Sequence, residues 1–323
     1  MESVNQKIMA IFGKKMEIML AAAIFLASTI LGVSSFALRG EGRSAYTAIH
    51  MSSAATSKAK GKLLVLGGTG FLGQTICRRA LLEGYKVTSL SRRGLLPDEA
   101  TATSSKSIDF RKGDARKPDV ISSILQEGGY VGVVHCIGLL LDDASGLGTY
   151  NRFVSGSGSV PDENSSYETI TKLTAFNAID ATLQFVKDNN ESGERFPFVF
   201  TSAAEAGWPD VTGGSQIEKF LAPKWLKRYL AAKRAVESRL IGSDGTSQFL
   251  RPIVVRPSLI YSLDRPASYA PVGAFFVGNK LGLPFVDRPV TVQSLANAVV
   301  KSISQSSNVE GVLRYPEIDS LNQ

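Results

Sequence analysis

The chain has 323 residues, of which 44% are hydrophobic and 20% are charged, and its net charge is +7. This composition excludes an intrinsically disordered chain, and the length allows one large α/β domain with an N-terminal extension or two small domains. Residues 1–62 hold eight Lys/Arg and three Glu, a net charge of +5, which leaves +2 for the rest. Because a body this close to neutral has no electrostatic footprint for nucleic acid, we expect no nucleic-acid partner.

The N-terminal residues 1–61 have the pattern of a targeting presequence. Residues 16–35 follow a basic flank, are strongly apolar and end in small residues, which is typical of a secretory-type signal. A membrane anchor is the alternative, since the apolar run is just long enough to span a bilayer. Residues 36–61 are rich in Ala, Ser and Thr, with Glu41 as the only acid, which is the composition of a transit peptide. The order of the parts, with Phe36 opening the second, resembles the two-part presequence of algae whose plastids lie inside extra membranes. We therefore expect a plastid location, with the mitochondrial inner membrane as the alternative.

From residue 62 onward, strand-like and helix-like segments alternate, which predicts a doubly wound parallel α/β sheet of the Rossmann type over residues 62–257. A small C-terminal region, residues 258–323, is expected to cover the substrate. The predicted strands are Leu63–Leu66, Val87–Leu90, Ser107–Arg111, Val131–His135, Phe198–Thr201 and Ile253–Pro257. The predicted helices are Gln74–Glu83, Pro118–Gln126, Tyr167–Asn189 and Leu226–Leu240.

A glycine-rich turn directly follows the first predicted strand. Three glycines recur at every third position, and each has a separate role: the first allows a tight turn, the second lets the backbone approach a pyrophosphate, and the third lets helix and strand pack closely. The helix N-terminus beyond it attracts phosphate. A glycine-rich turn without function is the alternative, but the flanking strand and helix favour a dinucleotide site. The residues assigned to it are Gly67, Thr69, Gly70, Phe71, Leu72 and Gly73.

Two arginines, Arg92 and Arg93, follow the second predicted strand, where an NAD site usually has a carboxylate for the ribose 2′-hydroxyl. Guanidinium groups suit a 2′-phosphate instead, so we expect NADP(H) to be preferred and NAD(H) to remain possible. A solvated basic turn is the alternative. Asp114, after the third strand, is positioned either to accept a hydrogen bond from the adenine amino group or to cap the next helix.

The fourth predicted strand ends at a segment expected to pass beneath the nicotinamide ribose, formed by Cys136, Ile137 and Gly138. His135, just before it, is interpreted as a packed residue rather than an acid or base. The chain has two cysteines and two histidines, which are too few and too scattered for a metal site, so no metal is expected.

Tyr229 and Lys233 lie four residues apart in a predicted helix, and therefore on one face of it. A nearby ammonium lowers the pKa of a phenol, so the pair is predicted to form an acid–base site near neutrality. Lys233 is also expected to hold ribose hydroxyls. A chance occurrence of the spacing is the alternative, although its position behind a nucleotide-binding pattern favours function.

With these motifs, residues 62–320 resemble the extended and atypical short-chain dehydrogenase/reductases, which are NAD(P)-binding and epimerase/dehydratase-like. Within this superfamily the chain is most similar to the coenzyme Q biosynthesis dehydrogenase-like proteins of mitochondria and their plastid relatives. It is more distantly similar to the 39-kilodalton accessory subunit of respiratory complex I. The branch is indicated by the segments 133–141, 233–237, 251–257 and 288–292, and by the segment that begins at Tyr167 and Glu168.

The sequence departs from the superfamily at the end of the fifth strand. Active members have a Ser or Thr there, whose hydroxyl helps to hold the substrate oxygen. The best register places Ala203 at that position, with Ser202 one residue early, and a slip of one residue turns a strand side chain to the other face. Ser202 is therefore a shifted candidate for the catalytic serine.

The resemblance implies an NADP-dependent oxidoreductase that acts on an isoprenoid quinone or its precursor. The alternative is a non-catalytic nucleotide-binding subunit of a membrane-bound multiprotein assembly. Two apolar segments, residues 271–278 and 281–286, are expected to belong to the core; lining a greasy pocket or touching a membrane is the alternative.

Overall fold

The computed structural model describes residues 60–94, 108–151, 161–189, 193–242, 246–262, 269–283, 286–304 and 308–323. The predicted presequence lies outside the described residues, apart from Lys60 and Gly61. The centre of the Gly/Ser-rich segment that follows the fourth strand, residues 152–160, also lies outside them.

The described residues form a seven-stranded sheet in which every pair is parallel, in the order β3-β2-β1-β4-β5-β6-β9. This order confirms the predicted doubly wound Rossmann sheet. The strands β1 to β3 are added toward one edge of the sheet, and from β4 onward the strands are added toward the other edge. The strands are β1 (Lys62–Leu66), β2 (Lys86–Ser91), β3 (Ile108–Lys112), β4 (Tyr130–His135), β5 (Phe196–Thr201), β6 (Leu250–Val255) and β9 (Gly311–Leu313).

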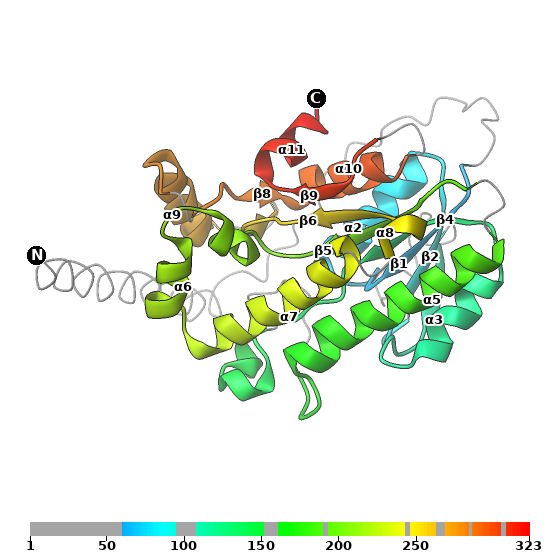
Figure 1. Ribbon diagram of the computed structural model, residues 1–323, viewed down its shortest axis with the longest axis horizontal. Helices are drawn as coiled ribbons and strands as arrows, with labels where there is room; N and C mark the ends of the chain where they lie inside the picture. Colours follow the sequence, from blue (N-terminus) through cyan, green and yellow to red (C-terminus); the bar gives the residue numbers. More distant parts are fainter. Residues whose placement is uncertain are drawn as a thin grey trace, which may run out of the picture.

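The sheet is buried on both faces, as parallel sheets generally are. Alternate residues of one strand enter two different clusters: Leu63 and Val65 of β1 pack with α2 and α10, whereas Leu64 and Leu66 pack with α3, α5 and α7. The same two helix layers are seen in Figure 1. The helices are α2 (Phe71–Leu82), α3 (Pro118–Gln126), α5 (Thr174–Asn189), α7 (Lys224–Ile241) and α10 (Val292–Ile303).

Two helix predictions differ from the structure. The helix α2 begins at Phe71, three residues before the predicted start, because Gly70 already has the extended conformation of an N-cap residue. The segment predicted as one helix from Tyr167 to Asn189 is divided into a π-helix, η5 (Tyr167–Leu173), and the α-helix α5. π-helical turns are rare and are found frequently at functional sites.

The C-terminal residues return to the main sheet. After a two-stranded sheet of β7 (Ile260–Tyr261) and β8 (Val290–Thr291), the chain forms α10, adds β9 beside β6, and ends in α11 (Tyr315–Ser320). Between β7 and β8 lies α9 (Tyr269–Lys280), shown in orange-brown in Figure 1. Thus the C-terminal residues both extend the Rossmann layer and build a lobe beyond it. Within the described ranges, none of the helices combines the length and hydropathy that crossing a membrane requires.

Smaller helical segments complete the chain: the 3-10 turns η3 (Asp143–Ser145), η4 (Gly148–Tyr150) and η6 (Ala204–Asp210), and the helices α6 (Gly214–Leu221) and α8 (Thr246–Phe249). η6 follows β5 directly, and α7 packs against both η5 and η6.

Candidate functional site

The candidate site lies at the carboxyl edge of the sheet, where the strands β1, β4, β5 and β6 all end. Backbone hydrogen bonds continue across this edge beyond the strands: Cys136 N–H donates to Leu66 O at 2.9 Å, and Ser202 N–H donates to Val255 O at 2.7 Å. Ligands of doubly wound sheets bind at this edge, outside the switch point between β1 and β4. The topology therefore places every loop with a predicted site residue at the same edge.

The glycine-rich turn leaves room for phosphate only at its middle glycine. Gly67 has φ +86°, a conformation that side chains rarely adopt, and a Cβ at Gly73 would lie 2.2 Å from Gly67 O. A Cβ at Gly70 would meet only Gly67 O, at 3.1 Å, so the outer side of this residue is open. No side chain caps α2 at Gly70, and the first amides of a helix have no intrahelical acceptor. This open, uncapped turn fits a pyrophosphate, and the three glycines have the geometries that the sequence predicted.

The segment after β4 lies between the glycine turn and the candidate catalytic pair. A Cβ on Gly67 would be 3.1 Å from the Ile137 backbone nitrogen, and a Cβ on Gly138 would be 3.7 Å from Lys233 Nζ. The structure thus brings Ile137 close to the glycine turn and Gly138 close to Lys233. The predicted path of this segment beneath a ribose requires such a position. The two residues before Ile137 are less suited to chemistry: burial lowers the pKa of His135 to about 3 and raises that of Cys136 to about 12.

The two arginines after β2 have different surroundings. Arg93 Nη2 donates to Thr69 O at 3.1 Å and so ties the basic turn to the glycine turn. Arg92 is 45% exposed and pairs with Asp162 at 3.6 Å, a surface contact that is worth little and is easily exchanged. The structure therefore places the Arg93 guanidinium on the glycine turn and the Arg92 guanidinium on Asp162.

Asp114 does not cap α3, because the N-cap residue is Lys117 and no side chain caps this helix. That alternative is therefore wrong. The Asp114 carboxylate is held by Arg116 through side-chain hydrogen bonds of 2.6–3.1 Å and through the Arg116 backbone N–H. These bonds hold the pKa of Asp114 below its usual value, so the group is an ionised acceptor.

Tyr229 and Lys233 lie on one face of α7, and the Lys233 ammonium is held by the main chain at the end of β5. Lys233 Nζ donates to Thr201 O at 2.6 Å and lies over the Phe200 and Tyr229 rings, 5.0 and 5.6 Å from their centroids. Burial, together with Glu205 and Tyr167, raises the pKa of Tyr229 instead of lowering it. The expectation of a phenol with a lowered pKa is thus wrong. Burial lowers the pKa of Lys233 to about 8.

Ser202 and Ala203 directly follow the end of β5 at Thr201. Ser202 and Ala203 are both buried, and Ser202 Oγ is a buried atom without a hydrogen-bond partner in the described part of the protein. Buried polar atoms without partners are rare in proteins, so this edge is built to accept a further polar group.

Two residues of the site were not assigned to it from the sequence. Tyr167, which opens a segment that indicates the family branch, also opens the π-helix, and its ring packs edge-to-face on Tyr229 with 5.6 Å between centroids. Its hydroxyl donates to Leu140 O at 2.8 Å, which fixes the loop after β4. Glu205 begins η6 with a partly buried carboxyl whose pKa is raised by burial to about 7, with a further contribution from Asp287. For Glu205, the only feature of the sequence that could have indicated a site residue was a carboxyl side chain just beyond the end of a predicted strand.

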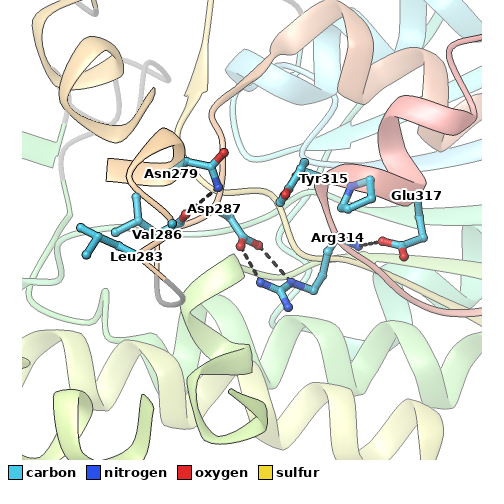
Figure 2. Close-up of a pocket in the computed structure, with 9 residues that line it drawn as sticks. Asn279, Leu283, Val286, Asp287, Arg314, Tyr315 and Glu317 are labelled. Atoms are coloured by element: carbon cyan, nitrogen blue, oxygen red, sulfur yellow. Dashed lines mark hydrogen bonds and ion pairs between the residues drawn. The ribbon is translucent and has the colours of Figure 1, made fainter. Parts of the chain in front are cut away.

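A pocket of about 370 Å³ lies in the C-terminal lobe, between the end of α9 and the start of α11 (Figure 2). Its centre is the pair of Asp287 and Arg314, joined by two hydrogen bonds of 2.5 and 3.0 Å. Beside it, α9 and the turn that follows expose four apolar side chains, those of Phe276, Val277, Leu281 and Leu283. Residues 271–278 and 281–286 were expected to belong to the core, and for these four residues that expectation is wrong.

The strand order and the glycine turn at the switch point define a doubly wound Rossmann fold, the class that nucleotide-binding proteins of the dehydrogenase and epimerase type share. Residues 63–153 match the model of the NAD dependent epimerase/dehydratase family. This match runs from β1 through the glycine turn to the loop after β4. The resemblance to epimerase/dehydratase-like short-chain dehydrogenase/reductases, predicted from the sequence, is confirmed.

Two curated relatives extend over most of the chain. MIOREX complex component 2 of Saccharomyces cerevisiae is 28% identical over 292 residues, which are 80% of this chain and 98% of the yeast protein. UDP-glucose 4-epimerase of Neisseria meningitidis serogroup C is 27% identical over 277 residues, 77% of this chain and 75% of the epimerase.

Solved structures share the fold. The UDP-glucose 4-epimerase of Thermus thermophilus, in complex with NAD, has a TM-score of 0.50 at 20% identity and covers 78% of this chain and 76% of its own. The 3-hydroxyacyl-CoA dehydrogenase type-2 of Mycobacterium avium has a TM-score of 0.54 at 19% identity, with coverage of 80% and 96%. ElxO with NADP bound also has a TM-score of 0.54, at 14% identity, with coverage of 78% and 96%.

Proposed function

We propose that this protein binds a nicotinamide dinucleotide, NADP(H) in preference to NAD(H), and acts as an oxidoreductase on an isoprenoid quinone or its precursor. The observation that carries the proposal is the open glycine turn at the switch point, where Gly73 lies close against Gly67 O but Gly70 has room beside it. This geometry lets a pyrophosphate approach the backbone and the uncapped N-terminus of α2. The relatives that were solved with NAD or NADP bound have the same fold.

The preference for NADP(H) is supported by the two guanidinium groups that follow β2, one of which lies on the glycine turn. Arg93 is already fixed on Thr69 O, and Arg92 is half exposed with only a weak surface partner. Arg92 can therefore turn to a ribose 2′-phosphate at little cost, and its planar fork matches phosphate oxygens. Asp114, ionised and held by Arg116, is an acceptor for the adenine amino group.

In the proposed chemistry, a bound NADPH supplies a hydride to a carbonyl carbon of the substrate. Tyr229 donates a proton to the carbonyl oxygen, which suits a phenol whose raised pKa keeps it protonated at neutral pH. Lys233, beside Gly138 and hydrogen-bonded to Thr201 O, is positioned for ribose hydroxyls. Ser202 remains a candidate to hold the substrate oxygen through its unpartnered hydroxyl.

The test is a fluorescence titration of the full chain with NADPH and with NADH, repeated on Arg92→Ala. A matched control is Arg195→Ala, because Arg195 forms a similarly exposed ion pair, with Glu310, but precedes β5 at the opposite edge of the sheet. We expect Arg92→Ala to weaken NADPH binding about tenfold or more, with NADH binding unchanged and the control equal to wild type. Equal affinities for both nucleotides refute the preference, and no binding of either refutes the dinucleotide site.

The oxidoreductase role is tested separately by NADPH oxidation in the presence of quinones. Turnover that persists undiminished in Tyr229→Phe contradicts the acid role of Tyr229.

The location that we propose is an organelle, the plastid or the mitochondrion, and its support is the presequence pattern of residues 1–61. Sequencing of the mature N-terminus tests that assignment.

A second candidate function is that of a nucleotide-binding subunit of a multiprotein assembly, at a membrane. Two points favour it: the register that we infer from the sequence puts Ala203 where active members of the superfamily have a hydroxyl, and the yeast relative is named as a component of a complex. Under this hypothesis, NADPH binds and stabilises the fold, but no quinone is reduced. Copurification of the tagged chain with a defined set of proteins, lost in a variant that cannot bind NADPH, supports it. NADPH-dependent quinone reduction by the purified chain alone argues against it.

A further inference from the structure

The turn that leads into η5 presents a carboxylate to one of the two arginines that follow β2. Asp162 lies in this turn, and its Oδ2 is 3.6 Å from Arg92 Nη1. Arg92 is the arginine that can turn to a ribose 2′-phosphate, because the Arg93 guanidinium is already bonded to Thr69 O. The Asp162 carboxylate therefore lies against the guanidinium that such a phosphate needs.

The two oxygens of the Asp162 carboxylate have different partners. Oδ1 accepts hydrogen bonds from Ser165 Oγ at 2.7 Å and from the Asn164 N–H at 3.1 Å, whereas Oδ2 faces Arg92. The Ser165 N–H also donates to Asp162 O at 2.8 Å, and the next residue, Ser166, is the N-cap of η5. These bonds hold the carboxylate from within its own turn. The negative charge of Asp162 therefore stays beside Arg92 even when the contact between them is broken.

A second ion pair, that of Arg116 and Asp114, belongs to the same group of charges. The hydrogen bond to Asp114 raises the pKa of Arg116, and the negative charge of Asp162 adds to this rise. In the same way, the charge of Arg92 adds to the lowering of the pKa of Asp114, for which the hydrogen bond from Arg116 is the main cause. The four side chains thus form one group in which two positive and two negative charges cancel. A 2′-phosphate gains less from this group than from its arginines alone.

Of the two carboxylates in this group, only that of Asp162 is free to be displaced. Asp114 is tied to Arg116 by side-chain hydrogen bonds of 2.6–3.1 Å and by the Arg116 backbone N–H. The separation of 3.6 Å between Asp162 and Arg92 is longer than a hydrogen bond, and both side chains are exposed, at 56% and 45%. A phosphate can therefore take the place of Asp162 on Arg92, but not that of Asp114 on Arg116.

We propose that Asp162 is a specificity-determining residue of the dinucleotide site, which competes with the ribose 2′-phosphate for Arg92 and so limits the preference for NADP(H) over NAD(H). This inference rests on the proposed function and adds to it a counter-charge from a different part of the chain. Asp162 lies beyond residues 63–153, which match the family model, and beyond the end of β2, where an NAD site usually has its carboxylate. A nucleotide without the 2′-phosphate has no need of Arg92, so Asp162 should not oppose its binding.

The experiment is a fluorescence titration of the full chain with NADPH and NADH, which differ only in the 2′-phosphate, repeated on Asp162→Asn. An asparagine keeps the oxygen that Ser165 and Asn164 use and removes only the charge. Because the ion pair is exposed, we expect NADPH to bind about fivefold more tightly and NADH binding to be unchanged. The matched control is Asp180→Asn, since Asp180 is 58% exposed and pairs with Arg239 on other elements, α5 and α7; it should leave both affinities unchanged.

The double variant Arg92→Ala/Asp162→Asn shows whether the effect passes through Arg92. It should bind NADPH no more tightly than Arg92→Ala alone, because there is no guanidinium left to release. The same gain in both backgrounds overturns the competition for Arg92. Unchanged or weaker NADPH binding in Asp162→Asn also overturns it, as does an equal gain for NADH or in Asp180→Asn.

These outcomes are distinct from a failure of the proposed function. Binding of neither nucleotide by the wild type and the variants refutes the dinucleotide site, and the inference with it. Binding of both nucleotides without any effect of Asp162→Asn refutes the inference alone. Equal affinity of the wild type for NADPH and NADH refutes the preference for NADP(H), yet a gain for NADPH alone in Asp162→Asn still supports the competition.

Discussion

The Lys233 ammonium is hydrogen-bonded to the main-chain oxygen of Thr201, at 2.6 Å, and this bond joins the middle of α7 to the end of β5. The same nitrogen lies over the ring of Tyr229, 5.6 Å from its centroid. Burial raises the pKa of the Tyr229 phenol, which favours the protonated form, suited to donate a proton.

The state of Tyr229 can be measured by ultraviolet absorbance during a pH titration of the wild type and Tyr229→Phe. Because burial, Glu205 and Tyr167 raise the pKa of Tyr229, we expect its ionisation to occur above the ordinary tyrosine value of 10.0. The difference between the two titrations isolates this phenol. Ionisation of Tyr229 below that value, in the absence of dinucleotide, would contradict the structure.

Alanine substitutions of two glycines separate folding from binding. In Gly73→Ala the new methyl group would lie 2.2 Å from Gly67 O, so we expect a loss of about 2 kcal/mol or more of unfolding free energy. In Gly70→Ala the nearest atom is 3.1 Å away and the fold should survive, but the methyl group occupies the open side that a pyrophosphate needs. Urea denaturation and NADPH titration measure the two effects. A Gly70→Ala protein that binds NADPH as well as wild type would show that the phosphate does not approach there.

Glu205 makes stability depend on pH in a predictable direction. Its pKa is raised from 4.5 to about 7, so the folded state favours the protonated carboxyl. Stability is therefore lost as pH rises from about 4.5 to about 7, and the loss is complete above that range. Relative to wild type, we expect Glu205→Gln to gain about 2–3 kcal/mol between pH 5 and pH 8. Denaturant unfolding of both proteins at the two pH values provides the measurement, and a pH-independent difference would show that Glu205 is not protonated in the folded state.

The pair of Arg256 and Glu237 is buried, with side chains that are 12% and 7% exposed and hydrogen bonds of 2.6 and 3.0 Å. Removal of one charge leaves the other buried and only partly compensated, so Glu237→Gln should cost about 3 kcal/mol of unfolding free energy. The exposed pair of Arg195 and Glu310 provides the comparison, and Glu310→Gln should cost less than about 1 kcal/mol. Thermal and urea unfolding distinguish the two variants, and equal costs would mean that burial does not determine the strength of these pairs.

Local patterns in the sequence determined the sheet, the glycine turn and the position of Tyr229 and Lys233 on one face of α7. Short apolar runs alternating with amphipathic segments predict parallel strands, and the strands were found within a few residues of the expected bounds. The close approach of Gly73 to Gly67 is also a local property, because the two residues lie six positions apart in the chain.

Contacts between distant segments were decided by the tertiary structure. The direction of Lys233 Nζ depends on Thr201, which lies 32 residues earlier, and the raised pKa of Tyr229 depends on Glu205 and Tyr167 from two other elements. The addition of β9 beside β6 and the pairing of Asp287 with Arg314 likewise join residues far apart in the chain. Such pairings are selected by packing and desolvation over the whole molecule, which no window of sequence contains. The sequence alone therefore determined where a dinucleotide can bind, whereas only the tertiary structure decided the protonation of the phenol and the charge of the neighbouring pocket.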